Sequence, residues 1–309
     1  MNLPDTFAVF ILTHGRPDNV ITAKTLAKCG YTGKLFFIVD NEDKTVDRYI
    51  ENFGRERVMV FRKKDAAKTC DAGNNFGEMR SILFARNACF DIAKAIDVTH
   101  FIELDDDYTG FELRWVSECG KRLLVKSAVD FTKAMLLYLR FFNESNMRCL
   151  AFAQGGDFIG GVNSGYAKKG MPMIRKVMNS FLCSTERPFK FIGVMNEDVN
   201  TYTTLGSRGE LFCTVPHLSF TQLATQSQAG GVTDMYLRFG TYCKSFMTVM
   251  QMPSAVKVGL IPGRHRRIHH LINWKATVPC IVRETHRKAD ITDELAGLAE
   301  DAADAAQDR

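Results

Sequence analysis

The sequence predicts an α/β protein in which a Rossmann-like, mostly parallel central sheet is flanked by helices. Continuous apolar runs at residues 7–12 and 34–39 are typical of strands that are covered on both faces. Other segments carry apolar residues at helical spacing, as helices that pack on a sheet do. Strand and helix alternate through the first 65 residues, which predicts parallel strands joined by right-handed crossovers.

Local signals place the elements in order along the chain. Pro17 is suited to begin the helix after the first strand, and Gly30 is suited to end it. Further strands are expected at residues 58–61, 99–104, 150–154 and 211–217. Helices are expected at 76–96, 129–144 and 236–250, a hairpin at 110–125, and polar loops at 62–75 and 221–231.

Three carboxylates follow the buried strand at residues 99–104. Asp105 and Asp107 are separated by one residue, and two such acids can share a divalent ion that takes its other ligands from phosphates. We therefore expect them to hold Mg²⁺ or Mn²⁺ on a diphosphate, with a solvated acidic turn as the alternative. Arg86 interrupts the apolar stripe of the preceding helix, so it must be paired or directed at an anion.

Polar residues also end the first two strands. Residues 13–16, Asp40 and residues 105–107 should converge on one crevice, because ligands lie at the carboxyl ends of parallel strands. A Gly-x-Gly-x-x-Gly motif is absent, which disfavours a dinucleotide-binding fold.

A second pair of acids, Glu197 and Asp198, follows an apolar run. A carboxylate there can remove the proton of a hydroxyl group, so both acids are candidates for a general base. The structural alternative is a helix start that Asn196 caps and both acids stabilise. Upstream, Gly155 and Gly156 precede Asp157, and glycines permit close approach of the backbone to a ligand or simply form a loop.

Charge is unevenly distributed. The formal net charge is +5, but residues 290–309 hold seven acids and one arginine, so residues 1–289 carry about +11. Such a body suits nucleic acid, or merely attracts nucleotide donors. Residues 264–275 are the densest basic and aromatic cluster, which can hold phosphate backbones, cover a donor diphosphate or be solvated.

Nine cysteines are dispersed without a Cys-x-x-Cys pair, which indicates reduced thiols. No apolar run approaches the roughly 20 residues that span a bilayer. The N-terminal residues also lack the pattern of a secretory signal. A cytoplasmic protein without a membrane partner is therefore expected.

The motifs also carry a family resemblance. An Ala-Arg-Asn helix at residues 85–87, a strand and then Leu-Asp-Asp-Asp at 104–107 resemble the signature of family 2 glycosyltransferases of the GT-A fold. Residues 11–17, 105–107 and 196–199 resemble the TET-associated glycosyltransferases of bacteriophages, which are relatives of base J glucosyltransferase. The resemblance implies transfer of a sugar from a nucleotide sugar, expected to be a UDP-sugar, to a hydroxymethylated pyrimidine of phage DNA.

The resemblance also implies roles for individual residues. It places Thr13, Arg16 and Asp40 at the nucleoside, Arg86 and Asp105 at the donor, and Gly155, Gly156 and Asp157 at the donor sugar. A third metal ligand is expected from His217 or His286. The resemblance makes Asp198 the general base, with Glu197 in reserve, of a single displacement that inverts the anomeric centre, with the target base flipped out of the duplex.

Three regions are expected: a GT-A catalytic core at residues 1–220, a basic segment facing the acceptor at 221–289, and a flexible acidic tail at 290–309. Three alternatives remain for the function. They are a GT-A enzyme acting on a saccharide, a nucleotidyltransferase, which usually has a longer Gly-rich loop after its first strand, and a non-catalytic DNA-binding module.

Overall fold

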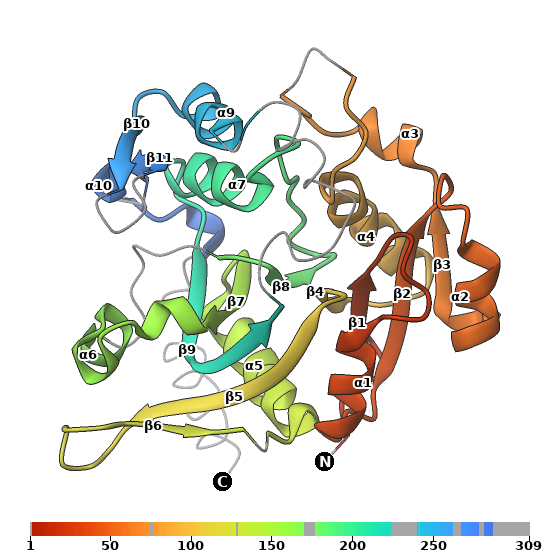
Figure 1. Ribbon diagram of the computed structural model, residues 1–309, viewed down its shortest axis with the longest axis horizontal. Coiled ribbons are helices and arrows are strands. Elements are labelled where there is room, and N and C mark those ends of the chain that lie inside the picture. Colours follow the sequence, from red (N-terminus) through yellow and green to blue (C-terminus); the bar gives the residue numbers. More distant parts are fainter. Residues whose placement is uncertain are drawn as a thin grey trace, which may run out of the picture.

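A sheet of nine strands runs through the molecule in the order β3-β2-β1-β4-β8-β7-β9-β5-β6 (Figure 1). The computed structural model describes residues 2–73, 77–127, 129–169, 177–223, 240, 242–261, 267–277 and 281–286. The predicted loop residues 224–231, the basic residues 262–266 and the acidic tail at 290–309 lie outside this range.

The first half of the sheet is parallel, as predicted. It contains β1 (Phe7–Leu12), β2 (Lys34–Asp40), β3 (Val58–Phe61) and β4 (His100–Asp105), which pair in register as parallel neighbours. The helices α1 (Ile21–Lys28), α2 (Val46–Phe53), α3 (Lys63–Ala67) and α4 (Leu83–Ala95) and the turn η1 (Arg55–Arg57) lie between these strands in the sequence. The alternation of strand and helix therefore produced the expected fold class.

The second half of the sheet is mixed. β8 (Ser180–Ser184), which was not predicted, lies between β4 and β7 (Cys149–Gln154) and is antiparallel to both. β7 pairs in parallel with β9 (Phe212–Gln222). β5 (Tyr108–Val116) and β6 (Leu123–Lys126) form the predicted hairpin at the outer edge, antiparallel to β9 and to each other.

Helices cover both faces of the sheet and bury a separate core on each. Val9 and Ile11 of β1 belong to the core beneath α1, α2 and α5 (Phe131–Ser145), whereas Phe10 belongs to the core beneath α4 and α7 (Glu197–Gly206). This alternation follows from the two-residue period of a strand. β1 is apolar on both faces because each face packs against a layer of helices.

Three local predictions were wrong in detail. The helix predicted from Pro17 begins at Ile21, although Gly30 does follow it with a φ of 68°. The helix predicted from residue 76 begins at Leu83, and a short helix, α3, occupies part of the predicted loop at 62–75. In each case tertiary contacts decide the boundary: for example, Ser81 Oγ donates to the Val194 carbonyl (2.8 Å) instead of lying in a helix.

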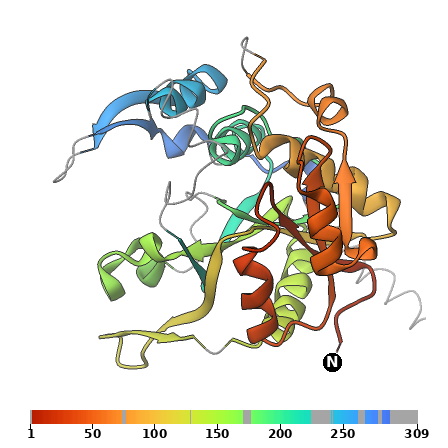
Figure 2. The same ribbon diagram turned by 45° about the vertical axis from the view of Figure 1, so that its right-hand side comes forward.

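Two small hairpins project from the body on the same side in both views (Figures 1 and 2). One is β5–β6, and the other is β10 (Val256–Ile261) with β11 (Arg267–Ile272). The remaining elements are η2 (Gly155–Phe158), η3 (Gly161–Asn163), α6 (Gly165–Lys169), α9 (Cys243–Gln251), α10 (Trp274–Thr277) and η4 (Glu284–His286).

The eight cysteines in the described part of the chain are free thiols, as expected of reduced residues. Of the described helices, none combines the length and the apolar character that crossing a bilayer requires.

Candidate active site

The carboxyl ends of β1, β2 and β4 meet at one edge of the sheet. Leu12 of β1 lies opposite Asp105 of β4, so Thr13 is next to Asp106. The Thr13 hydroxyl donates to Asp106 Oδ2 over 2.7 Å, and both side chains are buried. The predicted convergence of these strand ends is confirmed.

Asp106 organises the loop after β1, although nothing in the sequence distinguishes it from the two neighbouring acids. Arg16 Nη1 donates to Asp106 Oδ1 (3.1 Å), and the Arg16 backbone N–H donates to the Tyr49 hydroxyl (2.8 Å). Thr13 also contacts that hydroxyl, at 2.8 Å. Thr13 and Arg16 are therefore fixed against the carboxylate turn before any ligand binds.

Asp40, at the end of β2, is buried in a second polar network. Its carboxylate contacts His14 Nδ1 at 2.7 Å and Lys63 Nζ at 3.0 Å. Burial raises the pKa of Asp40, but the hydrogen bonds from His14 and Lys63 outweigh it and bring the pKa to about 2. The His14 side chain is 56% exposed, so it is the member of this network that faces solvent.

Helix α1 holds the backbone of the carboxylate turn. The Thr22 hydroxyl donates to the Asp105 carbonyl (2.6 Å) and accepts from the Tyr108 N–H (2.9 Å). The Thr25 hydroxyl donates to the Tyr108 carbonyl over 2.8 Å. Residues on both sides of Asp106 and Asp107 are thus anchored to a helix that belongs to the core.

Arg86 of α4 is the centre of the site's electrostatics. Its side chain is 1% exposed, and its three nitrogens contact Asp105 Oδ1 (3.1 Å), Glu197 Oε1 (3.1 Å) and Glu103 Oε2 (3.5 Å). The Phe181 ring lies against its guanidinium at 4.5 Å. Arg86 was expected to contact the donor directly, but it is enclosed and paired, so it positions carboxylates instead.

Three carboxylates contact the buried Arg86 guanidinium, and a fourth, that of Asp107, acts electrostatically on Asp105. Burial raises the pKa of Asp105 to about 7, although Arg86 lowers it, and Asp107 and Glu197 raise it further. Burial and Asp106 also raise the pKa of Asp107. Mutually repelling carboxylates at a strand end suit a hard divalent cation.

Asp105 and Asp107 are therefore the residues that fit a metal ion. In the described ranges no group of three or more His, Cys, Asp or Glu side chains is arranged to hold one. A metal on these two residues must take its remaining ligands from water or from a phosphate, as Mg²⁺ commonly does.

The residue after Arg86 ties α4 to the segment that leads into α7. The Asn87 amide donates to the Phe191 carbonyl (3.0 Å), and its oxygen accepts from the Phe191 N–H (2.9 Å). Gly193 has a φ of 83°, and a Cβ there would lie 2.3 Å from Asn200 Nδ2. The segment is thus shaped by contacts that sequence inspection had not identified.

Glu197 and Asp198 form the first turn of α7, so the helix start of the structural alternative is present, although the capping that it predicted for Asn196 is wrong. Asp198 is 9% exposed, and its Oδ1 accepts from the Val199 N–H over 2.7 Å. Asn196 occupies the cap position, but its side chain does not cap the helix. It donates to the Lys244 carbonyl (2.9 Å) and to the Thr248 hydroxyl (3.0 Å) of α9.

The glycine-rich turn η2 lies at the same edge of the sheet. Leu104 of β4 is opposite Ser180 of β8, whose hydroxyl accepts from the Phe152 N–H of β7 (2.9 Å). Gly155 and Gly156 therefore follow β7 on the side where Asp105 follows β4, two strand spacings or roughly 10 Å away. A Cβ at either glycine would meet nothing within 4 Å, so space remains beside them. The Asp157 carboxylate stabilises this turn, because it accepts a hydrogen bond from the Gln154 N–H (2.9 Å).

Neither histidine proposed as a third metal ligand lies at the carboxylates. His217 is exposed within β9, next to Leu218, which pairs with Leu113, the sixth residue of β5, whereas Asp107 immediately precedes β5. His286 is buried between the Asn146 carbonyl (2.7 Å) and Glu210 (2.9 Å). Both predictions are corrected: the register separates His217 from the site, and His286 is structural.

The family comparison decides the class of this protein. A model of the TET-associated glycosyltransferase family matches residues 7–231, which include every strand end described above. The chain belongs to the TET-associated glycosyltransferase family. It is therefore a glycosyltransferase, as the sequence had indicated. Among curated proteins, none matches the chain.

Solved structures resemble this TET-associated glycosyltransferase only distantly. Glucosyl-3-phosphoglycerate synthase from Mycobacterium tuberculosis, in complex with Mn²⁺, UDP and phosphoglyceric acid, is 11% identical with a TM-score of 0.41, over 89% of this chain and 88% of that one. S. aureus TarS, in complex with UDP-GlcNAc, is 12% identical with a TM-score of 0.44, over 80% of this chain and 66% of that one. Similarity at this level establishes neither donor nor acceptor.

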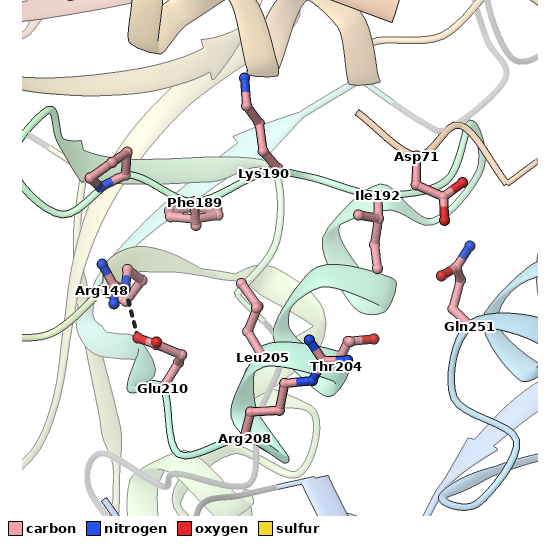
Figure 3. A pocket seen from close by; sticks show the side chains of 11 residues that line it. Asp71, Arg148, Phe189, Lys190, Ile192, Thr204, Leu205, Arg208, Glu210 and Gln251 are labelled. Carbon is pink, nitrogen blue, oxygen red and sulfur yellow. Dashed lines mark hydrogen bonds and ion pairs between the residues drawn. The ribbon is translucent and has the colours of Figure 1, made fainter. Parts of the chain in front are cut away.

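The TET-associated glycosyltransferase also has a cavity of about 410 Å³ away from the carboxylates. Arg148 and Glu210, which precede β7 and β9, lie at one end of it, and Asp71 and Gln251 lie at the other (Figure 3). Arg148 and Glu210 are paired at 2.6 Å. Because the cavity includes the amino ends of strands, it is separate from the site at their carboxyl ends.

Proposed function

We propose that this glycosyltransferase moves a sugar from a UDP-sugar to the hydroxymethyl group of a modified pyrimidine in DNA. The supporting observation is the pair of contacts from Arg86 to Asp105 and Glu197, both at 3.1 Å. One buried cation connects the carboxylate turn of β4 with the acidic start of α7. The groups needed at the donor and at the acceptor hydroxyl are thereby held in one rigid arrangement.

At the donor, Asp105 and Asp107 would hold Mg²⁺ or Mn²⁺. The ion would supply neutralisation of charge on a diphosphate leaving group. Thr13, Arg16 and the Asp40 network would bind the nucleoside, because they line the neighbouring strand ends and are already fixed by Tyr49 and Lys63. The open backbone at Gly155 and Gly156, with Asp157, would face the sugar.

At the acceptor, Asp198 would remove the proton of the hydroxymethyl group as that oxygen attacks the anomeric carbon. A hydroxyl is a weak nucleophile, and a positioned base speeds such a step by roughly 10² to 10⁴. Attack from the side opposite the leaving group inverts the anomeric centre. Glu197 is held by Arg86, so it is better placed to orient the turn than to accept the proton.

DNA as the acceptor is supported by charge and by the family. Residues 1–289 carry about +11, which favours a polyanion. A base inside a duplex is inaccessible to Asp198, so we propose that the target base is flipped out of the stack.

The test is mass spectrometry of nucleosides from DNA that contains hydroxymethylcytosine, after incubation with the protein, Mn²⁺ and a panel of sugar nucleotides. A metal-dependent mass gain of one sugar, absent with Asp105→Ala, is expected. Metal-dependent donor hydrolysis without any DNA product would instead favour a saccharide acceptor. If the wild type binds DNA but shows neither transfer nor hydrolysis, and Asp105→Ala and Asp198→Ala leave that binding unchanged, a non-catalytic module is favoured.

A further inference from the structure

The β5–β6 hairpin presents a basic and aromatic face to solvent. Trp115 pairs with Leu124 across the hairpin, and Leu113 pairs with Lys126, so these four side chains share one face. The Arg122 carbonyl accepts from the Ser117 N–H (2.8 Å), which continues the register and puts Arg122 on that face too. Here "the hairpin face" means Trp115, Arg122 and Lys126, together with Lys121 of the adjoining turn.

These side chains are exposed and their charges are uncompensated. Trp115 is 41% exposed, and Lys121, Arg122 and Lys126 are all exposed. None of the three cations makes an ion pair within the described ranges, and Glu118 at the tip is the acid of the turn between the two strands. A strand pair with three free cations and an exposed tryptophan has no role in the core.

The opposite face of the hairpin is occupied, which accounts for its shape. Arg114 lies on that face, where it contacts Glu112 (2.5 Å) and Ser219 Oγ (3.0 Å) and stacks over the Phe158 ring at 4.7 Å. These contacts join the hairpin to η2 and keep it from folding back. The hairpin itself projects from the body in both views (Figures 1 and 2), and the side chains of the hairpin face are exposed.

The hairpin begins at the candidate active site and ends far from it. β5 starts at Tyr108, directly after Asp107, and has 9 residues. At 3.4 Å per residue it extends by roughly 30 Å. One turn of B-DNA advances by about 34 Å, or roughly 10 base pairs.

We infer that the hairpin face binds the phosphate backbone of the acceptor duplex about one helical turn from the reacting base. This inference rests on the proposed function. Lys121, Arg122 and Lys126 pair with successive phosphates, and Trp115 packs along the sugars between them. Charge complementarity selects nucleic acid over a protein partner, because the face offers one exposed large apolar side chain, Trp115, among three cations.

The test compares two duplexes with one hydroxymethylcytosine at the centre, a long one with flanks of about 15 base pairs and a short one with flanks of about 5. Fluorescence anisotropy measures the Kd at several salt concentrations for the wild type and for K121A/R122A/K126A. The matched control is K28A/K34A/K94A, which removes three exposed lysines at the amino edge of the sheet. Donor hydrolysis without DNA reports whether each variant is folded.

For the long duplex, the hairpin variant should bind at least about tenfold more weakly than the wild type. Its log Kd should depend less steeply on log salt, by about 0.9 per cation removed. The short duplex should bind both proteins alike, and the control variant should match the wild type on both. Donor hydrolysis should be unchanged in all three proteins.

Equal binding of the long duplex by the wild type and the hairpin variant overturns the inference. So does an equal loss on both duplexes, because the contact would then lie beside the target base. Binding of the wild type to vesicles of anionic lipid as tightly as to the long duplex, with loss in the hairpin variant, assigns the face to a membrane surface instead. Absence of sugar transfer by the wild type in the nucleoside assay rejects the proposed function itself, whatever the binding results.

Discussion

Arg86 and Glu197 are 111 positions apart in the sequence, and the Arg86 Nε donates to Glu197 Oε1 over 3.1 Å. The same guanidinium contacts Asp105, so it fixes the spacing between the end of β4 and the start of α7. Removing this cation leaves Glu103, Asp105 and Glu197 together without compensation.

Arg86→Met should therefore destabilise the protein and abolish transfer. Loss of one partner from a buried ion-pair cluster typically costs about 3–5 kcal/mol of unfolding free energy. Urea unfolding of wild type and variant measures this directly. The control is Arg140→Ala, which breaks an exposed pair with Glu144 and should leave the midpoint unchanged. Equal stability of Arg86→Met and the wild type would show that the ion pairs of Arg86 contribute little to the free energy of unfolding.

Asp105→Asn and Asp107→Asn should each abolish metal-dependent donor hydrolysis, and a chelator should do the same to the wild type. His217→Ala should retain full activity, because the register of β9 separates it from the carboxylates. Metal binding, followed by calorimetry, should strengthen as the pH rises through about 7, the range to which burial raises the pKa of Asp105. Activity lost in His217→Ala would contradict the corrected ligand set.

Asp198→Asn should lower kcat by roughly 10² to 10⁴, with little change in the KM for the donor, because the base acts only on the acceptor proton. Glu197→Gln should keep measurable activity but reduce stability, since it leaves Arg86 with one fewer charged partner. Steady-state kinetics with each substrate varied in turn separates the two effects. If Glu197→Gln is the more damaging to kcat, the roles of the two acids are exchanged.

Gly193→Ala should reduce both stability and activity. Its φ of 83° is strained for alanine, and the added Cβ would lie 2.3 Å from the Asn200 amide, at the segment leading to Glu197. Gly165→Ala is the matched control, because a Cβ there meets nothing within 4 Å at an unstrained φ. Thermal unfolding and donor hydrolysis of the two variants provide the comparison, and equal behaviour would mean that the segment adapts freely.

The His14–Asp40 contact should make stability depend on pH. The hydrogen bond to Asp40 raises the pKa of His14 above 6.5, so its contribution is complete below that value and fades as the pH rises through the folded pKa. The pKa of Asp40 is about 2 in the fold against 3.8 in the unfolded chain, so its contribution is lost as the pH falls from about 4 towards 2. The destabilisation caused by His14→Ala, measured by urea unfolding, should thus be larger at about pH 5.5 than at about pH 8.5. In an Asp40→Asn background this difference should become smaller, because Asp43, 3.7 Å from His14 Nδ1, is then the remaining acid that raises the pKa of His14.

Much of the fold was readable from the sequence because its signals are local. Apolar runs such as Phe7–Leu12 identify strands buried on both faces, and a carboxylate run identifies where one ends. β8 escaped prediction because five residues between irregular segments carry no distinctive period, and its place is set by pairing with β4 and β7. Helix starts at Ile21 and Leu83 were misplaced because distant contacts, not capping residues, determine them.

The candidate site was partly predictable for the same reason. Asp105, Asp107 and the Glu197–Asp198 pair are conspicuous, since charge after an apolar run is unusual. Asp106 and Glu103 have no such signal: one is the middle of three identical acids, and the other alternates with apolar residues within β4. The pairing of Asp106 with Thr13 and of Glu103 with Arg86 depends on the packing of β1 and α4 against β4, which the sequence does not show.

The carboxylate turn is fastened to α1 and α4, whereas the hairpins β5–β6 and β10–β11 project beyond the two buried cores. Replacing the outer part of either hairpin therefore disturbs few contacts on which folding depends. The carboxylate turn and the outer hairpins are thus structurally separable, so residues of the β5–β6 hairpin, which we infer to contact the acceptor, can be changed without changing the turn. Substitutions intended to alter the acceptor range can therefore be made in the outer part of the hairpins without compensating substitutions in the catalytic centre.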